Sequence, residues 1–196
     1  PPSLFYVFFF RPPLPRVRRV RGPPYHGAPP PAGPVRAAVC DAYGWLFDVH
    51  SVASLAEQLF PGRGDALSQL WRQKQLEYSG LRAMSRRYKP FWDITRDALR
   101  FAAARLALPL APGLEVRLMN QYASLSAFPE NLPALRELKA AGLPLGILSN
   151  GNREMIEVSV RSAGMTGLFE HLLSSQSVET FKTTDDIYAL APAAFG

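Results

Sequence analysis

The stretch DAYGWLFDVHS, residues 41–51, follows directly on the apolar run VRAAVC of residues 35–40. This run has the length and composition of a short buried strand, and Gly44 predicts a turn soon after it. Asp41 would therefore lie at the carboxyl end of a strand. An aspartate in that position is either a turn former or cap, or a nucleophilic carboxylate, and the stretch alone leaves both interpretations open.

The next part of the chain, residues 51–127, has the pattern of helices. We expect helices over 51–60, 66–84, 91–108 and 113–125, because Pro and Gly interrupt the sequence between most of them. In the second helix, apolar residues recur at helical spacing and predict its buried face: Leu67, Leu70, Trp71, Leu76 and Leu81. Residues 51–127 are thus predicted to form an all-helical unit.

Strands alternate with helices after residue 128. A helix over 131–141 is followed by the short buried strand LPLGIL (143–148) and by a helix over 153–163. The segment HLLSSQSV (171–178) then leads to Lys182 and to a last helix over 185–194. This alternation predicts a parallel sheet, so we expect an α/β core over residues 35–50 and 128–196, split by the helical unit.

Polar residues stand at the predicted strand ends: Asp41, Ser149 with Asn150, and Lys182. Ligands of open parallel sheets bind outside the carboxyl ends of the strands, so we expect these side chains to converge. Lys182 would keep Asp41 ionised, and Ser149 with Asn150, next to a helix start, would offer donors to an anion. The core therefore predicts an anionic substrate that Asp41 attacks.

Composition limits the other function classes. The 196 residues are 47% hydrophobic, enough for one domain with a core, and residues 1–34 contain 11 of the 19 prolines, five arginines and no acidic residue. We expect this tail to be disordered, and we expect neither a nucleic-acid nor a membrane partner. Cys40 is the one cysteine, which excludes an internal disulfide and a cysteine-based metal cluster and is compatible with a reducing cytoplasm.

Five short motifs follow one another along the chain: DAYGxLFDVHS, WRQKQLEYSGLR, LSAFPE, ILSNGN and FKxxxxIYALA. In this order and spacing they resemble the L-2-haloacid dehalogenases of the haloacid dehalogenase superfamily, and the resemblance covers residues 35–196. It implies a Rossmann-type parallel sheet with an inserted all-helical cap over residues 51–127. It also implies a small-molecule 2-haloacid as the partner, no cofactor and no metal, and leaves a homodimer open.

The resemblance implies a role for each motif residue. Asp41 would displace the halide from an L-2-haloalkanoate with inversion and form an ester, which water would open to a D-2-hydroxy acid. Arg72 would receive the halide, and Lys182 would pair with Asp41. The residues that would contact the substrate are Tyr43, Gln73, Phe91, Ser149, Asn150 and Tyr188.

Two other functions remain open. Phosphatases of the superfamily carry a second aspartate two residues after the nucleophile, where this chain has Tyr43, and a phenol is a poor ligand for magnesium. The phosphatase hypothesis is therefore disfavoured. The other alternative is a catalytically dead fragment or binding module.

Three departures from the family pattern bear on activity. The least of them is that KTTDD (182–186) lacks the proline usual there. Trp45 stands where the family has threonine, so we expect crowding beside Asp41. The family also continues beyond ALAPAAFG (189–196) with a strand whose serine, asparagine and aspartate help to hold the hydrolytic water. We therefore expect the core to lack its C-terminal strand or strands, and the ester to turn over poorly.

Overall fold

The computed structural model describes residues 35–196, so the predicted disordered tail lies outside the described residues. Within this range, three short strands form one parallel sheet in the order β1-β2-β3. The strands are β1 (Ala38–Cys40), β2 (Leu145–Ser149) and β3 (His171–Ser174). The register pairs Cys40 with Ile147 and Ser149 with Ser174, so the carboxyl ends of the strands lie at one edge of the sheet.

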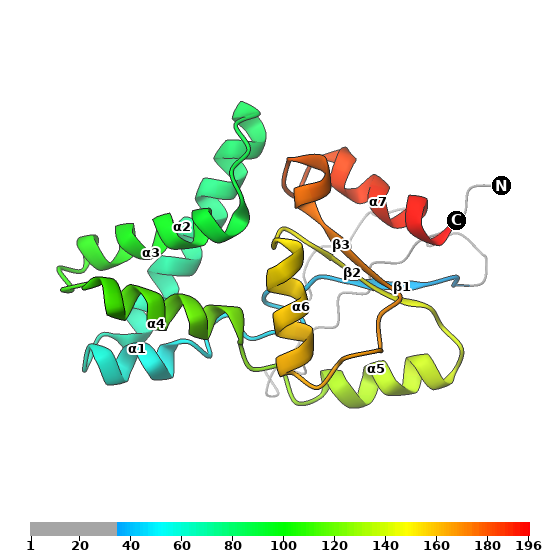
Figure 1. The fold of residues 1–196 in the computed structure, drawn as a ribbon, viewed down its shortest axis with the longest axis horizontal. Helices are drawn as coiled ribbons and strands as arrows, with labels where there is room; N and C mark the ends of the chain where they lie inside the picture. The colour runs from blue at the N-terminus through cyan, green and yellow to red at the C-terminus, as the bar shows by residue number, and fades with distance from the viewer. Residues whose placement is uncertain (1–34) are drawn as a thin grey trace, which may run out of the picture.

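Helices cover both faces of this sheet. Successive side chains of a strand point to opposite faces, so the apolar residues of each strand pack against helices on both sides. On one face, Val39 and Leu148 pack against Ile187 and Ala191 of α7 (Asp185–Phe195). On the other face, β2 contributes Leu145 and Ile147 to the main core, with α5 (Asn131–Ala140) and α6 (Arg153–Ser162). Figure 1 shows α7 apart from α5 and α6, with the sheet between them. This is the α/β arrangement that the strand and helix pattern predicted.

The long connection from β1 to α5 holds four helices, which we call the helical group. They are α1 (Ala53–Leu59), α2 (Gly64–Ser85), α3 (Phe91–Arg105) and α4 (Pro112–Ala123). In Figure 1 they lie together on the left, beside the sheet and its helices. A short 3₁₀ helix, η1 (Ser175–Val178), follows β3.

The buried face of α2 differs from the prediction. Leu67 and Trp71 are buried as expected, but Leu76 and Leu81 are 50% and 51% exposed. The buried face continues instead through the polar residues Gln75 and Ser79, which lie four residues apart on the same side of the helix as Trp71. Apolar spacing alone misplaced the second half of this face because polar residues with hydrogen-bond partners occupy it.

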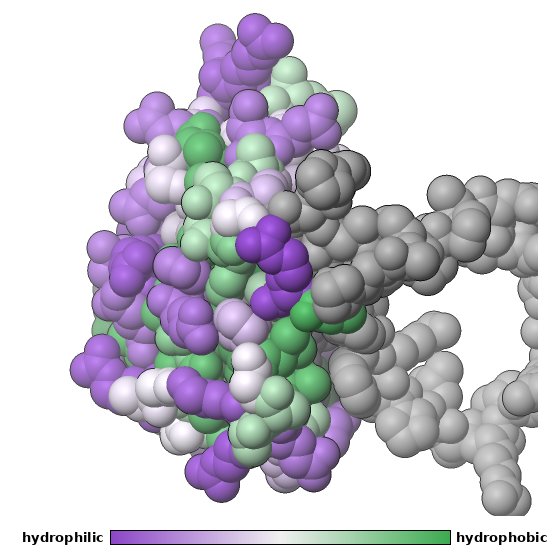
Figure 2. Space-filling view, turned by 90° about the vertical axis from the view of Figure 1, so that its right-hand side faces the viewer, coloured by the Kyte–Doolittle hydropathy of each residue, from purple (hydrophilic) through white to green (hydrophobic). Residues whose placement is uncertain are grey.

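The surface away from the helical group is mixed. Figure 2 shows that face with apolar surface near its centre and hydrophilic residues around it. No helix within residues 35–196 is long and apolar enough to cross a membrane.

Candidate active site

Asp41 lies immediately after β1, at the start of a tight turn. Its Oδ1 accepts hydrogen bonds from the backbone N–H of Ala42 at 2.8 Å and forms an ion pair with Nζ of Lys182 at 3.1 Å. Both side chains are largely buried, with 25% of Asp41 and 16% of Lys182 exposed. Gly44 closes the turn with φ of +95°, a conformation that side chains other than glycine rarely adopt. The predicted pairing of these two residues is thus present.

Lys182 is fixed by the neighbouring strand end. Its Nζ also donates to the carbonyl of Leu148 at 2.6 Å, and its backbone N–H donates to Oδ1 of Asn150 at 2.8 Å. The ammonium therefore bridges the ends of β1 and β2.

A cleft of about 280 Å³ opens at this point between the strand ends and α2. Four of the predicted site residues line it: Asp41, Asn150, Lys182 and Tyr188. The helical group contributes Leu76, Ser79 and Gly80. The half-exposed Leu76 thus faces a ligand-sized space and supplies apolar surface to it.

Among residues 35–196, the side-chain amide of Asn150 makes a hydrogen bond only through its oxygen. Because the carbonyl oxygen of this amide accepts from the backbone N–H of Lys182, the NH₂ group is the end left for the cleft. Ser149 is placed differently: it is fully buried, its Oγ accepts from the N–H of Gly151 at 3.1 Å, and it is not among the cleft-lining residues. Its contact with a substrate stays a prediction.

Arg72 reaches from α2 to the turn that carries Asp41. Its Nη2 donates to the backbone carbonyl of Tyr43 at 3.0 Å, and its Nη1 donates to Oε1 of Gln75 at 2.7 Å. A Cβ atom at Gly44 would lie 3.6 Å from Nη2, so the turn passes directly beside the guanidinium group. The structure therefore brings the predicted halide receptor to the Asp41 turn, although it is not among the residues that line the cleft.

Tyr43 and Phe91 form part of a buried aromatic cluster. The ring of Tyr43 stacks on Tyr122 with 6.0 Å between centroids, and lies 6.3 Å from Phe91, which in turn lies 6.0 Å from Phe181. Burial raises the pKa of the Tyr43 phenol, which keeps it neutral. Both aromatics are buried, and neither is among the cleft-lining residues, so their contact with a substrate stays a prediction.

Gln73 and Gln75 have opposite environments. Gln73, the predicted pocket residue, is exposed and is not among the cleft-lining residues, so its contact with a substrate stays a prediction. Gln75, which sequence reasoning missed, is fully buried and contacts Arg72. The available signal was its position four residues after Trp71, on the buried side of the helix.

Comparison with known proteins agrees with this geometry. The model of the haloacid dehalogenase-like hydrolases matches residues 35–196. The chain belongs to this family. It is 45% identical over 162 residues to an (S)-2-haloacid dehalogenase of Pseudomonas putida, covering 83% of this chain and 71% of that protein. A solved L-2-haloacid dehalogenase is 61% identical, with a TM-score of 0.80, over 82% of this chain and 73% of that one.

A second solved member of the family bears on the chemistry. The L-2-haloacid dehalogenase of Xanthobacter autotrophicus, solved with chloropropionic acid covalently bound, is 42% identical with a TM-score of 0.76. The match covers 81% of this chain and 64% of that one. The family resemblance drawn from the five motifs is therefore confirmed, as is the α/β fold of the haloacid dehalogenase type.

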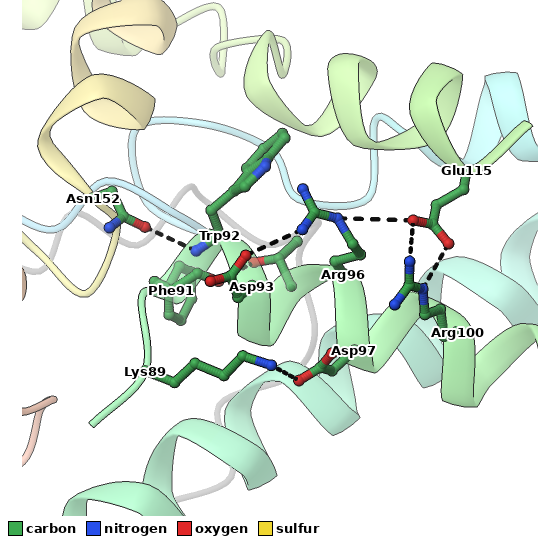
Figure 3. A network of polar contacts seen from close by, with 10 residues as sticks. Lys89, Phe91, Trp92, Asp93, Arg96, Asp97, Arg100, Glu115 and Asn152 are labelled. Carbon is green, nitrogen blue, oxygen red and sulfur yellow. Dashed lines mark hydrogen bonds and ion pairs between the residues drawn. The ribbon is translucent and has the colours of Figure 1, made fainter. Parts of the chain in front are cut away.

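Within this dehalogenase fold, the helical group and the sheet-bearing part meet at the start of α3. The side chain of Asn152 accepts a hydrogen bond from the backbone N–H of Trp92 at 2.8 Å (Figure 3). Asn152 stands at the N-cap position of α6, yet its side chain makes no capping bond there. It caps α3 instead, whose own N-cap residue, Pro90, has no side-chain acceptor.

The same view shows how α3 is tied to α4. Glu115 of α4 pairs with Arg100 at 2.7 Å and with Arg96 at 3.7 Å, and Arg96 also pairs with Asp93 (Figure 3). These ion pairs lie at the surface, where each contributes little to stability.

Two further predictions concern the surroundings of Asp41. The residues that line the cleft do not include Trp45, which is half-buried and whose carbonyl accepts from Nδ2 of Asn131 at 2.7 Å. Its effect on activity stays a prediction. Within residues 35–196, no group of three or more His, Cys, Asp or Glu side chains is arranged to hold a metal ion.

Proposed function

We propose that this chain hydrolyses the carbon–halogen bond of L-2-haloalkanoic acids and releases D-2-hydroxy acids. The observation that carries the proposal is the Asp41–Lys182 ion pair in a cleft at the strand ends. A relative of the same fold has chloropropionic acid covalently bound, which favours a covalent intermediate here too. Asp41 is the carboxylate in this cleft, and a carboxylate can form such an ester.

The two oxygens of Asp41 have different surroundings, which assigns them different tasks. Oδ1 accepts from Ala42 and pairs with Lys182, whereas Oδ2 accepts no hydrogen bond from the described residues. Oδ2 keeps its lone pairs available and attacks C2 of the substrate. The O–C2 bond forms as the C2–halogen bond breaks, and the halide leaves with the electron pair. Water then adds to the ester, which restores the carboxylate and yields the hydroxy acid and a proton.

The other residues bind the two ends of the substrate. The amide NH₂ of Asn150 binds the substrate carboxylate, with Ser149 as the predicted second donor. Arg72 receives the halide, because its fixed charge lies beside the Asp41 turn. Leu76 and Tyr188 enclose the alkyl group, and Tyr43, Phe91 and Gln73 are predicted to shape the remainder of the pocket. Residues 51–127 act as a cap over the core in this proposal.

Halide release from L-2-chloropropionate tests the proposal directly. The parent chain should release chloride, and Asp41→Asn should lose this activity by at least about a thousandfold, since an amide is a poor nucleophile. Mass spectrometry of the parent protein should find an ester on the peptide that contains Asp41. A protein without chloride release and without an adduct would instead support the catalytically dead alternative.

Two attributes of the working enzyme are part of the proposal and rest on the family alone. These are a cytoplasmic location and assembly as a homodimer. Size-exclusion chromatography with light scattering tests the dimer, because a monomeric mass at working concentration contradicts it.

A further inference from the structure

A buried row of polar side chains connects three helices of the helical group behind Arg72. Oε1 of Gln75 on α2 accepts from Nη1 of Arg72 at 2.7 Å and from the hydroxyl of Tyr122 on α4 at 2.9 Å. Nε2 of Gln75 donates to Oγ1 of Thr95 on α3 at 2.6 Å. Gln75 and Thr95 are fully buried and Tyr122 is 1% exposed. Polar groups this deep lower stability unless they are paired, and here they are.

The direction of every bond in this row is determined. Thr95 donates its only hydroxyl hydrogen to the carbonyl of Phe91 at 2.8 Å, so its oxygen can only accept from Gln75. The Gln75 amide must therefore turn its NH₂ toward Thr95 and its oxygen toward Arg72. Burial raises the pKa of Tyr122, which keeps its hydroxyl protonated and donating to the same oxygen.

Arg72 is consequently fixed at both ends of its guanidinium group. Nη1 donates to Gln75 and Nη2 donates to the carbonyl of Tyr43. These two contacts hold both terminal nitrogens of the guanidinium group on neutral oxygen acceptors. No ion pair with Arg72 is present within residues 35–196, so neutral acceptors orient the group without neutralising its positive charge there. A glutamate in place of Gln75 could still accept from Arg72, but it would lose the bond to Thr95 and would offset the charge that attracts an anion.

We propose that Gln75, supported by Tyr122, is a positioning residue that holds Arg72 in a charged, fixed state for the departing halide. This inference rests on the proposed function, because it takes the anion at Arg72 to be the halide. It predicts that Gln75 affects halide binding and turnover more than it affects the binding of the substrate carboxylate, which lies at Asn150.

The test compares Gln75→Glu with the parent and with a matched control, Gln69→Glu. Gln69 is exposed on the same helix, so its variant adds the same charge away from the row. Chloride binding is measured by line broadening in chlorine NMR, which needs no turnover. We expect Gln75→Glu to weaken chloride binding and to lower kcat about tenfold or more, with KM for L-2-chloropropionate little changed. Gln69→Glu should match the parent.

Further variants separate positioning from folding and from the proposed function. Tyr122→Phe removes one hydroxyl and should weaken chloride binding in the same direction but less, and it remains informative if Gln75→Glu unfolds. Parent-like chloride binding and kcat in both variants, alongside losses in Arg72→Ala, would overturn the inference while leaving the role of Arg72 intact. Parent-like behaviour of Arg72→Ala would overturn both the inference and the role of Arg72. A parent protein that releases no halide, while its variants show the expected changes in chloride binding, would overturn only the proposed function.

Discussion

Gly151→Ala should destabilise the protein through one contact, the approach of the Tyr43 ring to the backbone of residue 151. A Cβ atom at this position would lie 2.6 Å from Cε2 of Tyr43 and 3.4 Å from Oγ of Ser149. Ordinary contact begins at 3.4 Å, so the ring or the backbone must move by about 0.8 Å. The backbone of Gly151 is not in the left-handed region, so the alanine is not disfavoured by its own conformation.

The ring has no free direction in which to move. Tyr43 is 3% exposed, it stacks on Tyr122, and its carbonyl is held by Arg72. Overpacking of this kind costs about 1–3 kcal/mol, which exceeds the 0.4–1 kcal/mol that alanine gains by restricting the unfolded chain. For a domain of this size the net loss corresponds to a melting temperature lower by roughly 2–10 °C. Asn150 adjoins the strained residue, so halide release should fall as well.

Thermal and urea unfolding, with chloride release measured in parallel, check this expectation. Gly113→Ala is the matched control, because Gly113 lies in α4 with no atom within 4 Å of its added Cβ. That variant should be as stable as the parent or about 0.5–1 kcal/mol more stable. If Gly151→Ala is as stable and as active as the parent, the contact between Tyr43 and Gly151 does not constrain the site and the reasoning fails.

Two more predictions follow from single contacts. Asn152→Ala removes the acceptor at the start of α3 and should lower the free energy of unfolding in urea by about 1 kcal/mol. The control Asn120→Ala, at an exposed position of α4, should cost nothing measurable. Equal stabilities of the two variants would contradict the capping role. Burial, with a smaller effect of the Asp41 charge, raises the pKa of the Cys40 thiol from 9.0 to about 11, so the stability it contributes is complete below pH 9 and is lost as the pH rises through about 11. The stability of the parent relative to Cys40→Ser should decline over that interval, and a flat difference would show that the thiol ionises normally.

The convergence of Asp41, Asn150 and Lys182 could be predicted because it follows from topology. Each residue stands at or just after the carboxyl end of a strand or its following loop, and parallel strands bring those ends to one edge. The strand and helix pattern was enough to fix this arrangement. Only the distance of 3.1 Å between Asp41 and Lys182 required the structure.

The helical side of the site was harder to predict, since side-chain burial on a helix depends on its neighbours. Hydrophobic spacing assigned Leu76 to the core, but the helix turns it toward the cleft and buries Gln75 instead. Burying a glutamine lowers stability unless its amide has hydrogen-bond partners. Here Tyr122 on α4 donates to the amide oxygen, and Thr95 on α3 accepts from the NH₂ group. Within WRQKQ, the spacing of four residues from Trp71 separates Gln75 from Gln73, but it cannot show that partners on other helices pair with the buried amide.

The hydrogen bond from Trp92 to Asn152 makes the first turn of α3 dependent on a residue sixty positions further along the chain. Swinging the helical group away from the sheet would break this bond and leave the N–H of Trp92 to water, so such a swing would cost α3 one cap, about 1 kcal/mol. The helical segment is therefore not an exchangeable module. A chimera that takes residues 51–127 from another dehalogenase keeps the start of α3 only if residue 152 still accepts that bond.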